Sequence, residues 1–498
     1  GLPTHTEVDI LELRGETTLK IQSGLLRTFD AHNSNMTVWV VGGSSVFEPT
    51  ADTSVKGLIF QQGRVRPQAD LAVGVSIAWP SFNEGFVDGP GSLTILATCT
   101  ATIGTTGFGL NLQNGADLFV AGTLDVGRGR LRQGDGSEVT IRSSGNLIVD
   151  GGGARWTGAP GTPRVAVNNG TIEFDFSTPG QTTELIWIDL RNETGGQIDL
   201  GPGTVDFRND GGTRTGNFFN DGNINTGPFS PGGPSGFLDL ANCQTSDFGV
   251  NSVVSGAKIG LSDGTIDALT SNWTVLETRL RFTSTVTFNG DWSFPILDVN
   301  GANIEHAGNI VVTDQMVQTV NGRTRFFGGG TFELAAEATT NPLPFSIEFE
   351  GVDATIDGTM TIRGGGGGLL QSAGSSLTIN GELRFEQNAA WSGNDDVGSE
   401  TAINNGLMTV DMPGSNVQWI DVDITNNGTI RIDGGRVRFN NGINNNGGTL
   451  VNAATGTIDV GHTSGSADAF LDLGQAQGWD FVAGSTTKGR QVSDRLRD

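Results

Sequence analysis

The chain has 498 residues, of which 77 are glycine and only 17% are charged, and its formal net charge is −25 at pH 7. This charge argues against a nucleic-acid-binding protein, because phosphate binding needs clustered lysine and arginine. Hydrophobic residues reach 36%, which is more than a disordered chain carries. No apolar stretch reaches the ~20 residues of a membrane-spanning helix, so we expect a folded chain without membrane insertion.

Residues 1–115 are less regular in sequence than the rest, and we expect an irregular β-rich N-terminal region there. A stack of β-coils exposes unpaired strand edges at its ends, and natural solenoids cover them. Residues 1–22 are therefore interpreted as a cap or as an arm exchanged between molecules. This segment is acidic through Glu7, Asp9 and Glu12.

Residues 116–470 repeat a five-residue phrase of glycine, threonine, an apolar residue, any residue and a second apolar residue. The alternation places both apolar residues on one side of the chain, which predicts short strands with one buried face. The phrase occurs as GTLDV at Gly122, GTIEF at Gly170, GTVDF at Gly203, GTFEL at Gly330, GTMTI at Gly358, GTIRI at Gly428 and GTIDV at Gly456.

A short basic run lies near the start of this region, in GRGRLRQ. Its alternate spacing predicts that Arg128, Arg130 and Arg132 share one face of a strand. We interpret this run as a solvated strand edge.

A fuller form of the phrase, Asn-Asn-Gly, starts at Asn404, Asn426 and Asn445. Coils of about 20 residues stack at the ~4.8 Å spacing of neighbouring strands, which places each apolar residue above its equivalent. Asparagines at a shared corner could then hydrogen-bond along the stack, and asparagine and glycine both tolerate left-handed backbone. These features predict an all-β fold, a parallel β-solenoid.

Tandem antiparallel β-sandwich domains are the alternative fold. SLTINGELRF (residues 376–385) and TVTFNGDWSF (residues 285–294) both place Asn-Gly between alternating segments, which is a strong hairpin signal.

Residues 208–236 form a loop insertion in which the sequence predicts no strand. Long loops of this kind are usually functional or disordered. Phe218, Phe219 and Phe229 argue for burial, either against the solenoid's own flank or against another molecule. The three phenylalanines are the candidate interaction residues.

Residues 471–498 are expected to form a C-terminal cap with a basic tail that carries Arg490, Arg495 and Arg497. Opposite charge at the two ends favours head-to-tail self-association, a contact that produces open filaments. The alternative is that both tails fold back on their own molecule.

Few residues suggest chemistry. Asp395, Asp396 and Glu400 are candidate calcium ligands, or simply part of a solvated turn, and no catalytic residue is assigned. The four histidines are scattered, so no zinc site is expected. Cys99 and Cys243 are predicted to be two buried free thiols, with a single disulfide as the alternative.

The Asn/Gly/Thr-rich phrasing resembles that of autotransporter passengers and related repeat proteins of bacterial surfaces, from about Gly115 to Val460. The resemblance implies a long right-handed parallel β-helix and a secreted, extracellular protein. We therefore expect a non-enzymatic structural subunit of a bacterial surface fibre, sheath or stalk, with copies of itself as partner and no cofactor except possible calcium. The alternatives are an adhesin that binds surface glycans and a polysaccharide hydrolase or lyase.

Overall fold

The computed structural model has an all-β fold. It describes residues 5–8, 16–28, 35–79, 84–103, 109–150, 153–160, 163–176, 180–208, 216–227, 235–281, 283–318, 322–340, 346–363, 368–387, 389–394, 400–412, 417–439, 448–461, 469–474, 476–489 and 492–493. Within these residues, the only helix is a single 3-10 turn, η1 (Thr270–Asn272).

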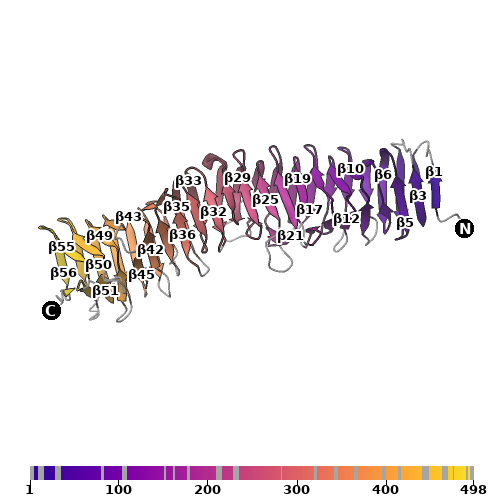
Figure 1. Ribbon diagram of the computed structural model, residues 1–498. Helices are drawn as coiled ribbons and strands as arrows, with labels where there is room; N and C mark the ends of the chain where they lie inside the picture. The colour runs from indigo at the N-terminus through magenta and orange to yellow at the C-terminus, as the bar shows by residue number, and fades with distance from the viewer. Residues whose placement is uncertain are drawn as a thin grey trace. The chain divides into compact units, whose positions relative to one another are not determined.

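The chain divides into two compact units. The first comprises Gly1–Asp263 and Ser271–Val275, and the second Gly264–Thr270 and Leu276–Asp498. In each unit the strands follow one another as parallel rungs in chain order (Figure 1).

The strands of the first unit form three parallel ladders, and the long strands β6, β8 and β29 take part in two of them. Ladder A contains β6 (Thr53–Gln61), β8 (Asp70–Ala78), β10 (Ser92–Ile95), β13 (Asp117–Val120), β16 (Val139–Ile141), β19 (Arg164–Asn168), β22 (Ile188–Asn192), β25 (Asn217–Asn220) and β28 (Thr245–Phe248). Ladder B contains β2 (Thr17–Ile21), β4 (Met36–Val41), β6, β8, β11 (Thr100–Thr102), β14 (Thr123–Asp125), β17 (Asn146–Asp150), β20 (Thr171–Asp175), β23 (Gln197–Leu200), β26 (Asn223–Asn225) and β29 (Val253–Leu261). Ladder C contains β1 (His5–Val8), β3 (Gly24–Thr28), β5 (Ser45–Pro49), β7 (Arg64–Val65), β9 (Gly85–Asp88), β12 (Gly109–Gln113), β15 (Arg130–Gln133), β18 (Arg155–Gly158), β21 (Thr182–Ile186), β24 (Thr204–Arg208), β27 (Phe237–Asp239) and β29.

The second unit also has three parallel ladders, two of which share β33 and β35. Ladder D contains β30 (Gly264–Ile266), β32 (Thr285–Phe288), β34 (Asn303–His306), β36 (Thr324–Phe327), β39 (Ile347–Glu350), β42 (Gly368–Ser372), β45 (Ala390–Asn394), β48 (Val417–Ile420), β51 (Arg436–Phe439), β54 (Phe470–Asp472) and β57 (Val492–Ser493). Ladder E contains β33 (Trp292–Asp298), β35 (Asn309–Val317), β37 (Thr331–Leu334), β40 (Asp353–Ile356), β43 (Ser376–Ile379), β46 (Thr401–Asn404), β49 (Asp423–Asn426), β52 (Thr449–Asn452) and β55 (Gly478–Phe481). Ladder F contains the second-unit part of β31 (Trp273–Leu280), β33, β35, β38 (Thr339–Thr340), β41 (Thr359–Arg363), β44 (Glu382–Glu386), β47 (Leu407–Asp411), β50 (Thr429–Gly434), β53 (Thr457–Val460) and β56 (Thr486–Gly489).

The predicted parallel β-solenoid is confirmed, and the β-sandwich alternative is wrong. The two Asn-Gly segments are corners rather than hairpins. On either side of Asn380, β43 pairs with β40 and β46, whereas β44 pairs with β41 and β47. The strands before and after an Asn-Gly therefore belong to different ladders, each paired with neighbouring coils.

The repeated phrase behaves as predicted. In β20, Ile172 and Phe174 are buried, while Thr171 and Glu173, which alternate with them, are partly exposed. The glycine that opens the phrase is needed because the coils approach closely at this corner. A Cβ on Gly170 would lie 2.2 Å from the carbonyl oxygen of Arg142 in the preceding coil.

The parallel pairing begins in the N-terminal region, where less regular structure was expected. The strands β2, β4, β6 and β8 pair in sequence, and β10 pairs with β13 across residue 115. Strands in this region are less uniform in length, since β6 and β8 have nine residues each and β7 has two. Unequal strands weaken the periodic signal in the sequence although the ladder continues.

The prediction that residues 208–236 contain no strand is wrong, because two strands lie inside this range. These are β25 in ladder A and β26 in ladder B. Phe218 of β25 is buried and packs between Phe207 and Phe248. The strands were missed because asparagine replaces the usual apolar or threonine residues at several of their positions.

Asparagine does stack at corners, as predicted, and each unit has one buried column. In the first unit, Asn168 donates to Asn192 Oδ1 at 2.7 Å, and Asn192 donates to Asn220 Oδ1 at 2.6 Å. All three side chains are fully buried. Continuous amide chains of this kind satisfy polar groups that would otherwise be costly to bury.

The column of the second unit consists of Asn404, Asn426 and Asn452, with both amide–amide hydrogen bonds at 2.7 Å. The sequence predicted Asn445 as the third asparagine of this series, but the structure has Asn452 in that place. Asn445 itself lies outside the described residues. The coils vary in length: 22 residues separate the first pair and 26 the second. A fixed interval therefore selected the wrong corner.

Candidate functional site

A cleft of about 660 Å³ lies on the outer side of ladder C in the first unit. Its lining includes Arg130 and Arg132 from β15, Arg155 and Thr157 from β18, and Trp187 at the corner after β21; we call this the arginine cleft. The register sets Arg130 beside Arg155 and Arg132 beside Thr157. The alternate residues of both strands point inward, which leaves the arginines on the outer face.

Two of the three arginines are held by carboxylates. The Nη1 atom of Arg132 lies 3.1 Å from Glu84 Oε1, and Nε of Arg155 lies 2.9 Å from Glu184 Oε2. Arg130 forms no ion pair with any residue in the described ranges. Its register neighbours are Gly109, which has no side chain, and the like-charged Arg155. Among the described residues, the cleft therefore keeps one uncompensated positive charge.

The floor of the cleft is fixed from inside. Trp156 is buried under the strands, and its indole N–H donates to Gln133 Oε1 at 2.6 Å. The Gln133 amide in turn donates to the carbonyl of Val165 at 2.9 Å. Because these buried groups tie β15 to β18 and to the next coil, the outward arginines rest on a rigid base.

Trp187 has an unusual backbone at the edge of the cleft. Its φ angle is 61°, in the left-handed region that a bulky residue rarely adopts. Its carbonyl accepts a hydrogen bond from the Arg164 N–H at 2.8 Å. A Cβ on Gly158 would lie 2.1 Å from the same carbonyl oxygen. Strained backbone of this kind is often found at functional sites.

The basic run in the sequence only partly predicts this cleft. Arg130 and Arg132 share the outer face of β15, but Arg128 lies in the turn before the strand, so the prediction that all three share one face is wrong. Arg155 and Trp187 come from later coils. No local signal could join them to Arg130 without the register.

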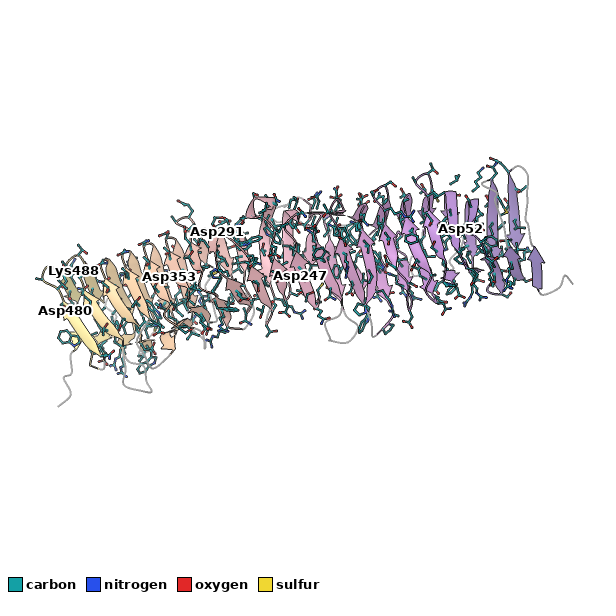
Figure 2. All side chains as sticks on the ribbon, turned by 45° about the horizontal axis from the view of Figure 1, so that its top comes forward. Asp52, Asp247, Asp291, Asp353, Asp480 and Lys488 are labelled. Carbon is teal, nitrogen blue, oxygen red and sulfur yellow. The ribbon has the colours of Figure 1, made fainter. Side chains whose placement is uncertain are left out.

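A second depression, of about 550 Å³, lies on ladder A of the first unit, and two of the predicted interaction residues, Phe218 and Phe219, line it. Phe219 is 36% exposed there, between Arg191 and Asp247 in register; Asp247 is labelled in Figure 2. Asp189 at its edge accepts hydrogen bonds from the backbone and side chain of Asn217. Phe218 is buried and unavailable for contact, whereas Phe219 remains a candidate.

Most other predicted site residues fall outside the described part of the structure. Glu7 lies in β1, but its side chain is outside the description. The remaining ones lie outside the described residues and stay predictions: Asp9, Glu12, Phe229, Asp395, Asp396, Arg490, Arg495 and Arg497.

Glu400, the third predicted calcium ligand, is buried next to another carboxyl group. Burial raises the pKa of Asp421 to about 6; a hydrogen bond from the Gly393 N–H opposes the rise, and the Glu400 charge adds to it. Among the described residues, no three histidine, cysteine or acidic side chains are grouped as a metal site would require. Calcium binding by Asp395, Asp396 and Glu400 stays a prediction.

Both cysteines are buried free thiols, as predicted. Burial raises the pKa of Cys99 to about 11, and burial together with nearby carboxylates raises the pKa of Cys243 well above its usual range. Thiols of this kind are poor nucleophiles.

The described residues include no helix that is long and apolar enough to cross a membrane. No known protein-family model matches the chain, and no curated protein matches it in sequence. The case for its function therefore depends on the fold and the two lateral depressions.

Proposed function

We propose that this chain is a non-enzymatic structural protein, a subunit of an extracellular fibre, sheath or stalk on a bacterial surface. The observation that carries the proposal is the pair of buried asparagine columns within uninterrupted parallel ladders. Along each column, three successive coils are bonded by backbone and side chain together. Such a fold resists local unfolding because every coil supports its neighbours.

The acidic side chains of the outer faces add to this bonding between coils. Asp52 accepts a hydrogen bond from the Asp70 N–H at 3.2 Å in the first unit. In the second unit, Asp291 accepts one from the Asn309 N–H at 2.8 Å, and Asp353 one from Ser376 Oγ at 2.6 Å. Figure 2 labels these three aspartates. The strong negative charge of the chain is thus compatible with a structural role.

The proposal predicts that the protein assembles with copies of itself. Purified protein should form species that grow with concentration, measured by sedimentation velocity and by negative-stain electron microscopy, with and without calcium. A single monomeric species under all these conditions would overturn the filament proposal.

The head-to-tail contact is tested separately by charge reversal. The variant Glu7→Lys with Glu12→Lys should raise the concentration needed for assembly by about tenfold, because it removes attraction to the basic tail. The control is Asp314→Lys with Glu337→Lys, which reverses two exposed acidic residues within the second unit. Equal effects of the two variants would show that only net charge matters.

The enzymatic alternative has its own test. Acidic polysaccharides are incubated with the protein, and new reducing ends or unsaturated sugar products are measured. Degradation above the level of a heat-inactivated sample would replace the structural proposal with a catalytic one.

A further inference from the structure

We propose that the arginine cleft binds a uronic-acid oligosaccharide, a sugar chain that carries one carboxylate per residue. This binding site goes beyond the structural role and does not depend on it. The proposal is built from charge, hydrogen-bonding groups, an aromatic surface and size, all at one place on ladder C.

Arg130 supplies the positive charge for ligand binding. Its guanidinium group has no carboxylate partner in the described ranges, while Arg132 and Arg155 are paired with Glu84 and Glu184. A planar guanidinium matches a carboxylate through two parallel hydrogen bonds. The paired arginines keep further N–H donors, since each guanidinium has five. The cleft thus offers one free charge and several fixed donors.

Neutral side chains beside the arginines supply further hydrogen-bond donors and acceptors. The Thr157 hydroxyl and the Gln113 side-chain amide line the cleft, and neither is hydrogen-bonded to another group in the described part of the protein. Hydroxyl and amide groups both donate and accept, as sugar hydroxyls do. This lining suits a ligand with many hydroxyl groups and one acid.

Trp187 supplies an aromatic surface at the cleft. Its indole N–H has no hydrogen-bond acceptor among the described residues, and the residue is partly exposed at the cleft. Tryptophan combines a broad apolar face with one donor, which suits surfaces that are partly apolar and partly wet. The left-handed backbone of Trp187 places this side chain at the corner, where a sugar ring can lie against it.

Size and net charge select among anionic ligands. A volume of about 660 Å³ lies within the range of small-molecule sites and suits a short oligosaccharide. The chain's net charge of −25 disfavours long, densely charged polymers such as nucleic acids. A uronate places one carboxylate at Arg130 and hydroxyls elsewhere. An acidic peptide is the rival ligand.

The test is isothermal titration calorimetry of the full chain with a mannuronate trisaccharide, with mannotriose as the matched neutral sugar. The two sugars differ in their carboxylates. We expect the mannuronate to bind and mannotriose to bind at least about tenfold more weakly, because it lacks the partner of Arg130.

Three variants locate the binding. Arg130→Gln should weaken mannuronate binding by about tenfold, and Trp187→Asn, which tolerates the left-handed backbone, should weaken it as well. The matched control is Arg128→Gln, which removes the same charge two residues away, outside the cleft lining; its binding should stay within about twofold. Circular dichroism melting confirms that each variant is folded.

Several outcomes would overturn the proposal. These are absence of mannuronate binding up to about 10 mM, well above the Kd range of a specific site; equal weakening by Arg128→Gln and Arg130→Gln; and tighter binding of a glutamate-rich peptide than of the uronate. None of these results would affect the assembly measurements, so failure here is distinct from failure of the structural proposal.

Discussion

The two buried asparagine columns, one in each unit, are alike in sequence context and differ at their first residue. In the coil before each column, the register position of the asparagine is held by an isoleucine, Ile141 or Ile379. In the coil after each column, the same position is held by a phenylalanine, Phe248 or Phe481. In the first unit, Asn168 Oδ1 accepts the Gly170 N–H at 3.2 Å. In the second, Asn404 Oδ1 is buried without a partner.

The difference separates two contributions of a column. The bonds between asparagines hold neighbouring coils in register, whereas the terminal bond satisfies the polar end. A buried oxygen without a partner costs about 1–3 kcal/mol, so the second column should contribute less to stability than the first. Four predictions follow from this comparison, in order of expected effect.

The largest effect is expected at the middle of each column. Asn192→Ala or Asn426→Ala removes two amide–amide hydrogen bonds and leaves both neighbours partly unsatisfied. Each variant should destabilise its unit by about 3 kcal/mol. Hydrogen exchange resolved by peptide measures the loss coil by coil. Loss of protection spread evenly over the chain would contradict a local role for the columns.

At the first residue the two columns should respond differently. Asn168→Ala loses a satisfied acceptor as well as the donor to Asn192, whereas Asn404→Ala also removes an oxygen that already lacks a partner. We therefore expect Asn168→Ala to cost about 1 kcal/mol more than Asn404→Ala. The same exchange measurement compares them, and equal costs would mean that the Asn404 oxygen is satisfied in solution.

One aspartate in each unit, Asp421 and Asp221, should contribute to stability with opposite pH dependence. Asp421 in the second unit has a pKa of about 6, above the value of about 4 in an unfolded chain. The folded state therefore binds a proton more tightly, and this group destabilises the fold at pH 7 but not below about pH 4. Asp421→Asn keeps an acceptor for the Gly393 N–H. It should stabilise the protein by about 1 kcal/mol at pH 7, with no gain near pH 4, as measured by thermal melting at both values.

Asp221 in the first unit is the counterpart. Burial alone would raise its pKa, but hydrogen bonds from Thr194 and Asn251 outweigh burial and lower the pKa below its usual range. Its contribution is present at neutral pH and is lost as the pH falls through the folded value. Asp221→Asn should therefore slightly destabilise the protein at pH 7. A gain in stability at that pH would contradict the assignment.

The smallest effect is expected in the exposed row beside the second column. Asn427 donates to Asn405 at 3.0 Å, and Asn405 donates to Asn380 at 2.9 Å. Water can replace these bonds, so Asn405→Ala should cost about 0.5 kcal/mol. This variant controls for asparagine replacement itself. A cost equal to that of Asn426→Ala would show that burial does not matter.

The sequence was sufficient for the strands of the repeated phrase, their alternation and the stacking of asparagine, because each depends on local pattern. Ile172 and Phe174 could be placed inward from period alone. The ladder partners could not, since coil length varies and Asn452 rather than Asn445 completes the column.

The arginine cleft shows the same limit. Arg130 is visible in the sequence, but its significance depends on Gly109 and Arg155 lying beside it and on Trp187 two coils further on. These residues are distant in sequence and come together only through the register. Side-chain neighbours across coils therefore require the three-dimensional structure.

The isoleucine and phenylalanine that bound each column have a consequence for folding. A repetitive chain can misalign by one coil with little change in strand pairing. Such a slip would take one asparagine out of its column, and would leave another amide without its partner. The correct alignment is the one in which all three asparagines are hydrogen-bonded to one another. Each column therefore favours a single register of the coils.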